Sequence, residues 1–166
     1  MVGLDLILIL ILGAFVVSGL WIGFVGTLGA LLGVFVATYF AGSWFEKIAD
    51  SVSFLFLGNQ NMANVVVFVG LFTIIHHLFG VLFWGVELIF RIVSLVPFIR
   101  TFNRMLGAIL GFVEGVLAIS VVLYIVARFP IGSFSEMLID SRLAKFFLIV
   151  AKVLTPLLPE SVQKLI

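Results

Sequence analysis

The feature that most constrains the fold is a run of 40 residues, 6–45, without one Asp, Glu, Lys, Arg or His. As one straight helix this run would be about 60 Å long. The hydrocarbon core of a bilayer is only about 30 Å thick, so a single crossing would leave half of this apolar surface in water. We therefore predict a hairpin of two membrane spans, residues 4–24 and 27–45, with the turn in the glycine-dense stretch 19–26.

Composition supports a membrane protein. Hydrophobic residues make up 64% of the 166 residues and charged residues only 10%, whereas about a quarter of the residues in soluble domains are charged. The net charge of +1, with scattered Lys and Arg, offers no surface for nucleic acid. Zero cysteines exclude disulfides, thiolate metal sites and cysteine nucleophiles. A cleavable signal peptide is not expected, because no basic residue precedes the first apolar run.

Two further spans follow, at residues 65–85 and 105–127, which gives an all-α polytopic protein with four transmembrane helices in residues 1–130. Amphipathic stretches at 46–57 and 87–99 are predicted to lie in the membrane interface. Between the second and third spans, Gly58-Asn59-Gln60-Asn61 predicts a turn, and Asn61 or Asn64 is expected to cap the next helix.

The remaining residues, 131–166, are predicted to form a C-terminal amphipathic tail. Within it, residues 141–154 place apolar side chains on one helix face and Arg142, Lys145 and Lys152 on the other. Fourteen residues are too few to span a bilayer comfortably. This helix is therefore expected to lie on the membrane or on the bundle.

Two rows of small residues recur at four-residue spacing, which puts each row on one helix face. Such rows let helix backbones approach closely in membranes, and two rows on different helices predict mutual packing. The rows consist of Gly29, Gly33 and Ala37, continued by Ala41, in the second span and of Gly107, Gly111 and Gly115 in the fourth.

Only three charged or histidine residues lie away from the ends of the predicted spans: His76, His77 and Glu114. His77 belongs to a stripe of small and polar residues in the third span, so it is predicted to face a partner and to pair with Glu114 at similar depth. The pair has two interpretations, a titratable site in a polar pathway or a structural hydrogen bond between helices or subunits. The structural interpretation is preferred, because the chain supplies no second polar site.

Three segments resemble the colicin V production protein family. They are Asn103-Arg104-x-Leu106-Gly107-Ala108-x-x-Gly111-x-x-x-Gly115, the N-terminal run with its early Asp5, and Asp140-Ser141-Arg142-Leu143-Ala144 followed by Leu157-Leu158-Pro159. The first hairpin departs from the family by lacking basic residues. The resemblance implies a small polytopic accessory protein of the bacterial inner membrane, linked to toxin export and envelope homeostasis, and it transfers no catalytic residue.

The alternative function is a small oligomeric channel or transporter with a polar path near His77 and Glu114. An enzyme is not expected, because adjacent histidines lack the i, i+4 spacing of a metal site and no nucleophile elbow or phosphate loop occurs. No cofactor is predicted. The expected partners are the lipid bilayer, further copies of the chain, and export or envelope proteins.

The distribution of basic residues gives a prediction of orientation. Arg91, Arg100 and Arg104 lie between the third and fourth spans, whereas only Lys47 and Arg128 lie close to a span on the side of the termini. Counting these close charges predicts both termini outside the cytoplasm.

Overall fold

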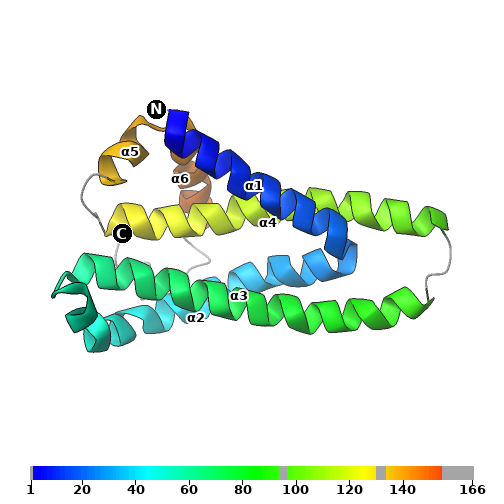
Figure 1. The fold of residues 1–166 in the computed structure, drawn as a ribbon, viewed down its shortest axis with the longest axis horizontal. Helices are drawn as coiled ribbons and strands as arrows, with labels where there is room; N and C mark the ends of the chain where they lie inside the picture. The colour runs from blue at the N-terminus through cyan, green and yellow to red at the C-terminus, as the bar shows by residue number, and fades with distance from the viewer. Residues whose placement is uncertain (1, 94–96, 130–133, 155–166) are drawn as a thin grey trace.

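The computed structural model describes residues 2–93, 97–129 and 134–154. All of the regular structure in these ranges is helical, and four of the helices are long and apolar enough to cross a membrane (Figure 1). The predicted all-α polytopic fold is confirmed. Residues 94–96 of the predicted interfacial segment, residues 130–133, where the predicted tail begins, and residues 155–166 at its end lie outside the described residues.

The first two spans form a sharp hairpin. Helix α1 covers Val2–Ile22 and α2 covers Phe24–Val52, so a single residue, Gly23, separates them. Gly23 has φ 90° and ψ 179°, a backbone conformation that side chains with a Cβ atom rarely adopt. The turn predicted within residues 19–26 is thus one glycine long.

The predicted interfacial segment 46–57 is not a separate helix. Helix α2 continues through it to Val52, with Phe45 and Ala49 fully buried, and a 3-10 turn, η1 (Ser53–Phe56), follows. The next helix, α3 (Gln60–Val93), is capped by Asn59, whose Oδ1 accepts the Met62 N–H at 3.1 Å. Asn59 therefore takes the capping role predicted for Asn61 or Asn64.

The second interfacial segment, 87–99, is also divided between longer helices. Helix α3 continues without interruption past Gly85 to Val93, and α4 (Pro97–Arg128) begins inside the predicted segment. Proline suits the first position of a helix, because the first turn leaves its N–H groups unpaired in any case. Pro97 therefore starts α4.

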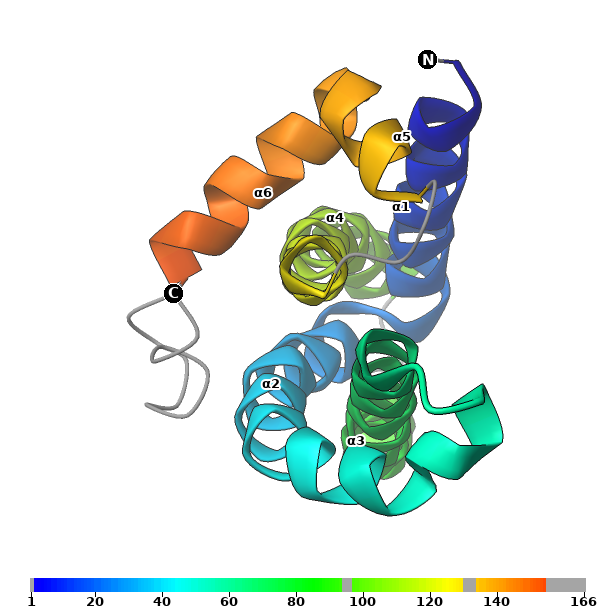
Figure 2. The same ribbon diagram turned by 90° about the vertical axis from the view of Figure 1, so that its left-hand side faces the viewer.

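The spans pack as two pairs. Helix α1 lies along α4, α2 lies along α3, and α2 also contacts α4 (Figures 1 and 2). Phe45 of α2 packs edge-on against Phe68 of α3 and Phe129 beyond α4, which joins the pairs at one end of the bundle.

The C-terminal segment holds two helices, α5 (Phe134–Asp140) and α6 (Arg142–Leu154). Figure 2 views the bundle nearly along α3 and α4, and α6 runs across this view, outside α4. Ala144, Phe147 and Ala151 are buried, whereas Arg142, Lys145 and Lys152 are exposed. Helix α6 thus lies on the bundle, and α5, which the sequence pattern did not predict, leads into it.

Candidate functional site

The glycines of α4 form its contact with α1. A methyl group added to Gly107 would fall on the carbonyl oxygen of Gly19, and one added to Gly111 would fall on the carbonyl oxygen of Phe15. At Gly115 the added carbon would lie 2.9 Å from Phe15 Cβ. The two backbones are therefore in direct contact, which only residues without a side chain permit.

The small residues of α2 face a different helix. A methyl group on Gly29 would overlap the Phe83 ring, and one on Gly33 would lie 3.0 Å from Phe79 Cβ, both on α3. Ala37 is completely buried. The predicted mutual packing of the two rows is wrong, because the α2 row packs against α3 and the α4 row packs against α1. Four-residue spacing identifies a face that can pack closely and leaves the identity of the neighbour open.

Two side chains that the sequence analysis left without a role tie distant parts of the chain together. Asn103 Oδ1 accepts the Phe24 N–H at 3.1 Å, so α4 satisfies the first turn of α2 just after the Gly23 break. Four residues along α4, Gly107 lies directly against Gly19 and Gly23. Asn103 and Gly107 together hold the hairpin turn.

The second tie joins the two ends of the chain. Asp5 Oδ1 of α1 accepts hydrogen bonds from the Ser141 hydroxyl and from the Leu143 N–H, at 3.2 Å for the latter. Ser141 Oγ in turn accepts the Ala144 N–H at 2.9 Å. A carboxylate at a helix N-terminus is favourable, so Asp5 fixes the start of α6. The described parts of all three segments of the family resemblance therefore contribute to contacts between helices.

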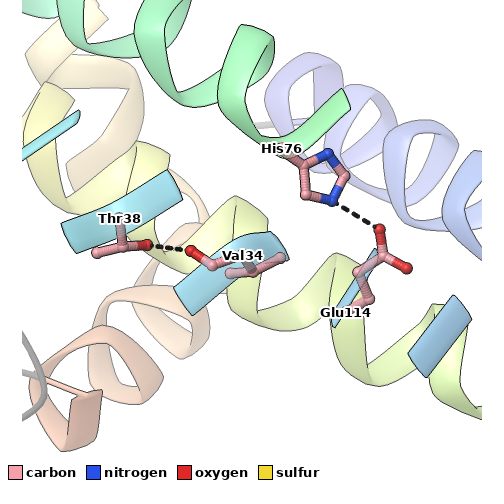
Figure 3. A network of polar contacts seen from close by, with 4 residues as sticks. All are labelled: Val34, Thr38, His76 and Glu114. Carbon is pink, nitrogen blue, oxygen red and sulfur yellow. Dashed lines mark hydrogen bonds and ion pairs between the residues drawn. The ribbon is translucent and has the colours of Figure 1, made fainter. Parts of the chain in front are cut away.

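The buried polar pair is formed by His76 and Glu114. His76 Nε2 lies 3.0 Å from Glu114 Oε1, and the two side chains are 13% and 7% exposed (Figure 3). The His76 ring is stacked parallel to Phe72 and meets Phe15 edge-on. Thr38, drawn nearby, bonds to its own helix at Val34 O and takes no part in the pair.

The predicted partner of Glu114 was the neighbouring residue, His77, and this prediction is wrong. Adjacent residues point about 100° apart on a helix, so a modest error in the rotation of α3 exchanges them. Among the described residues no helix lies opposite the stripe that contains His77: methyl groups added to its glycines, Gly70 and Gly80, would meet nothing within 4 Å. His77 itself is exposed, on the open side of α3.

The open side of α3 borders a groove of about 790 Å³ between α1 and α3, floored by α4. Its floor is buried and almost wholly apolar, formed by Ala118, Ile119 and Leu123 around Glu114. Its rim is exposed, with Ile7 and Ile11 on α1 and Val81 and Trp84 on α3. His76, His77, Thr73 and Ser18 are the other polar side chains along it. The groove is the candidate functional site, because it brings the ionisable residues of the spans together.

The groove does not present a metal site in the described part of the chain, where no group of three or more His, Asp or Glu side chains is arranged to hold an ion. Its chemistry is that of a hydrogen-bonding pair set in hydrocarbon. An intramembrane carboxylate is costly unless it is paired, and His76 supplies the partner.

Comparison with known proteins gives two matches. A family model described as colicin V production protein matches residues 4–152. A protein of Bacillus subtilis (strain 168) described as the uncharacterized transmembrane protein YshB is 28% identical over 173 residues, covering 95% of this chain and 96% of its own. No solved structure matches.

Proposed function

Because the chain belongs to the colicin V production protein family, we propose that it is an accessory protein of the bacterial inner membrane that supports toxin export and envelope homeostasis without catalysing a reaction. One observation carries the proposal. The residues of the family resemblance, such as Asn103, Gly107 and Ser141, build contacts between helices, and the described residues hold no group of three or more metal-binding side chains beside them. A protein of this kind acts through its shape and its contacts in the bilayer.

A complementation experiment tests this role. In a toxin-secreting strain that lacks the gene, the wild-type chain should restore secreted toxin activity and resistance to detergents. Gly107→Val, which breaks the helix contact, should restore neither, whereas Glu114→Gln should restore both. Normal secretion and resistance in the strain without the gene would refute the proposal.

Self-association is part of the proposed role, with further copies of the chain, or export and envelope proteins, as partners. The support is the exposed surface of α3 beyond the groove, where Gly70 and Gly85 leave room for another backbone. The detergent-corrected mass of the purified protein should be a whole multiple of 18.2 kDa, the mass of one chain, and larger than that mass. A mass equal to one chain would remove this part of the proposal.

The second candidate function is a small oligomeric channel or transporter. It is favoured by the depth of the His76–Glu114 pair, since Glu114 lies at the middle of the hydrophobic segment Thr101–Arg128. Ion or proton flux into liposomes containing the purified protein should then depend on Glu114, and Glu114→Gln should abolish it. Equal flux with wild-type, variant and empty liposomes would refute the channel.

We further propose that the termini lie in the cytoplasm. Because α6 packs against the bundle, Arg142, Lys145 and Lys152 lie near the ends of the spans and join Lys47 and Arg128 on that side. These five basic residues outnumber the three at the opposite end of the bundle, Arg91 near the end of α3 and Arg100 and Arg104 near the start of α4, which reverses the orientation predicted from sequence. A thiol-specific reagent that cannot cross membranes should label a cysteine introduced beside Arg104 in intact spheroplasts, and not one introduced at Lys152.

A further inference from the structure

The groove between α1 and α3 is long. Its lining extends along α1 from Leu4 to Ile22 and along α3 from Val69 to Trp84. At 1.5 Å per residue these stretches are about 27 Å and 22 Å long. The groove therefore covers most of the height of the hydrocarbon core, which is about 30 Å.

The groove is also narrow. A volume of about 790 Å³ over a length of about 25 Å gives a mean cross-section of about 30 Å². Carbon atoms in contact lie about 4 Å apart, so one extended hydrocarbon chain needs roughly 20 Å². The groove thus has room for a single extended chain along its length.

The polar groups of the groove lie at one depth. Glu114 is buried on the floor about halfway along, and His77 and Thr73 of α3 also line the groove. In the described residues Glu114 has one hydrogen-bonding partner, His76, through Oε1. A carboxylate can accept at both oxygens. A hydroxyl or amine group of a ligand would donate a hydrogen bond to the second carboxylate oxygen of Glu114, whereas a purely hydrocarbon chain would leave that oxygen without a donor.

The rim decides where the occupant comes from. The exposed side chains Ile7, Ile11 and Val81 border an opening that faces sideways, where the bilayer lies. Trp84, near the end of the hydrophobic segment Gln60–Val86, is placed where aromatic side chains meet lipid headgroups. An occupant enters from the hydrocarbon phase.

We propose that this groove is a binding site for a single-chain lipid of the bilayer that carries a hydrogen-bond donor, such as a long-chain aliphatic alcohol, with the donor on Glu114 and the chain along α1 and α3. This site goes beyond the proposed accessory role and does not depend on it.

The test uses the full-length protein in nanodiscs and a photoreactive sixteen-carbon alcohol. Irradiation should label peptides of α1 and α3, unlabelled hexadecanol should compete, and hexadecane should compete poorly. Ala14→Phe, at an exposed position in the lining, should fill the groove and remove most of the labelling. The matched control is Gly13→Phe, one residue away on α1, where an added carbon meets nothing within 4 Å and labelling should persist.

A second variant tests the polar contact. Glu114→Gln keeps the shape of the side chain and removes its charge, so the alcohol should bind about tenfold more weakly, the effect of losing one charge-assisted hydrogen bond. Labelling that is unchanged in Ala14→Phe, or lost equally in Gly13→Phe, would overturn the site. Equal competition by hexadecane would overturn the polar contact. Crosslinks joining two chains through the groove would assign it to a second copy and also overturn the proposal.

Discussion

Glycines on two helices of this protein have opposite surroundings in the fold. Gly107, Gly111 and Gly115 on α4 are pressed against the backbone of α1, whereas methyl groups added to Gly70 and Gly80 of α3 would meet nothing within 4 Å among the described residues. The glycines of α4 join two spans, and Gly80 borders the open groove. The difference teaches that small residues mark a face able to pack closely, and that the remainder of the chain determines whether a neighbour arrives there.

The largest effect on stability is expected from a substitution that disrupts the packed glycines of α4. In Gly107→Val, new carbon atoms would collide with the Gly19 carbonyl oxygen and with Gly23, so the hairpin must move. We expect a loss of more than about 4 kcal/mol in the free energy of unfolding, beyond the range of most single substitutions. Thermal unfolding of the purified protein in detergent measures it. A stable, wild-type-like protein would show that α1 is not packed on α4.

The second-largest effect on stability is expected from a substitution in the His76–Glu114 pair. His76→Ala removes the partner of buried Glu114 and should lower stability by about 1–2 kcal/mol, the range for a hydrogen bond between membrane helices. The matched control is His77→Ala, one residue along on the open face, which should leave stability unchanged. The same unfolding measurement decides, and a larger loss for His77→Ala would restore the pairing predicted from sequence.

The hydrogen bond from the Phe24 N–H to Asn103 at the hairpin should contribute somewhat less to stability. Asn103→Ala leaves the first N–H of α2 without its side-chain acceptor and should cost about 1 kcal/mol, as for other helix caps. Hydrogen exchange at Phe24 should accelerate in this variant and stay unchanged in Arg104→Ala, which alters the exposed neighbour. Equal exchange rates in the two variants would contradict the cap.

The smallest effect on the single chain is expected on the open side. An added methyl group in Gly70→Ala meets nothing within 4 Å, so the stability of the monomer should not fall. Any change should appear only in the association of chains, measured as the detergent-corrected mass. A marked loss of monomer stability would mean that α3 has a helix neighbour on this face.

The sequence predicted the parts of the fold that depend on local pattern. A 40-residue uncharged run cannot be one crossing, so a hairpin with its turn in the glycine-dense stretch 19–26 followed from the sequence. In the structure, Gly23 forms this turn at positive φ. The helices, however, extend beyond the apolar spans, because a helix needs only internal hydrogen bonds to continue into the interface. This explains why segments 46–57 and 87–99 proved to be parts of longer helices.

The candidate site was less predictable, because it depends on how helices turn toward one another. Glu114 was identified because it is an acidic residue inside a span. Choosing between His76 and His77 as its partner required knowing the rotation of α3 about its axis. Asp5 and Ser141 lie 136 residues apart, and no periodicity connects them. Their only signal was that both belong to segments of the family resemblance.

The pairing of α1 with α4, with α3 held apart across the groove, is tested most directly by disulfide formation in membranes, since the chain has no cysteine of its own. A Cβ atom at Gly115 would lie 2.9 Å from Phe15 Cβ, slightly closer than the separation of about 3.5–4.5 Å between the Cβ atoms of a disulfide, so the two helices need to separate by only about 1 Å to form the bridge. The cysteine pair Phe15→Cys with Gly115→Cys should therefore crosslink, and the pair Ile11→Cys with His77→Cys, on opposite sides of the groove, should not. Crosslinking of the second pair without the first would contradict this arrangement.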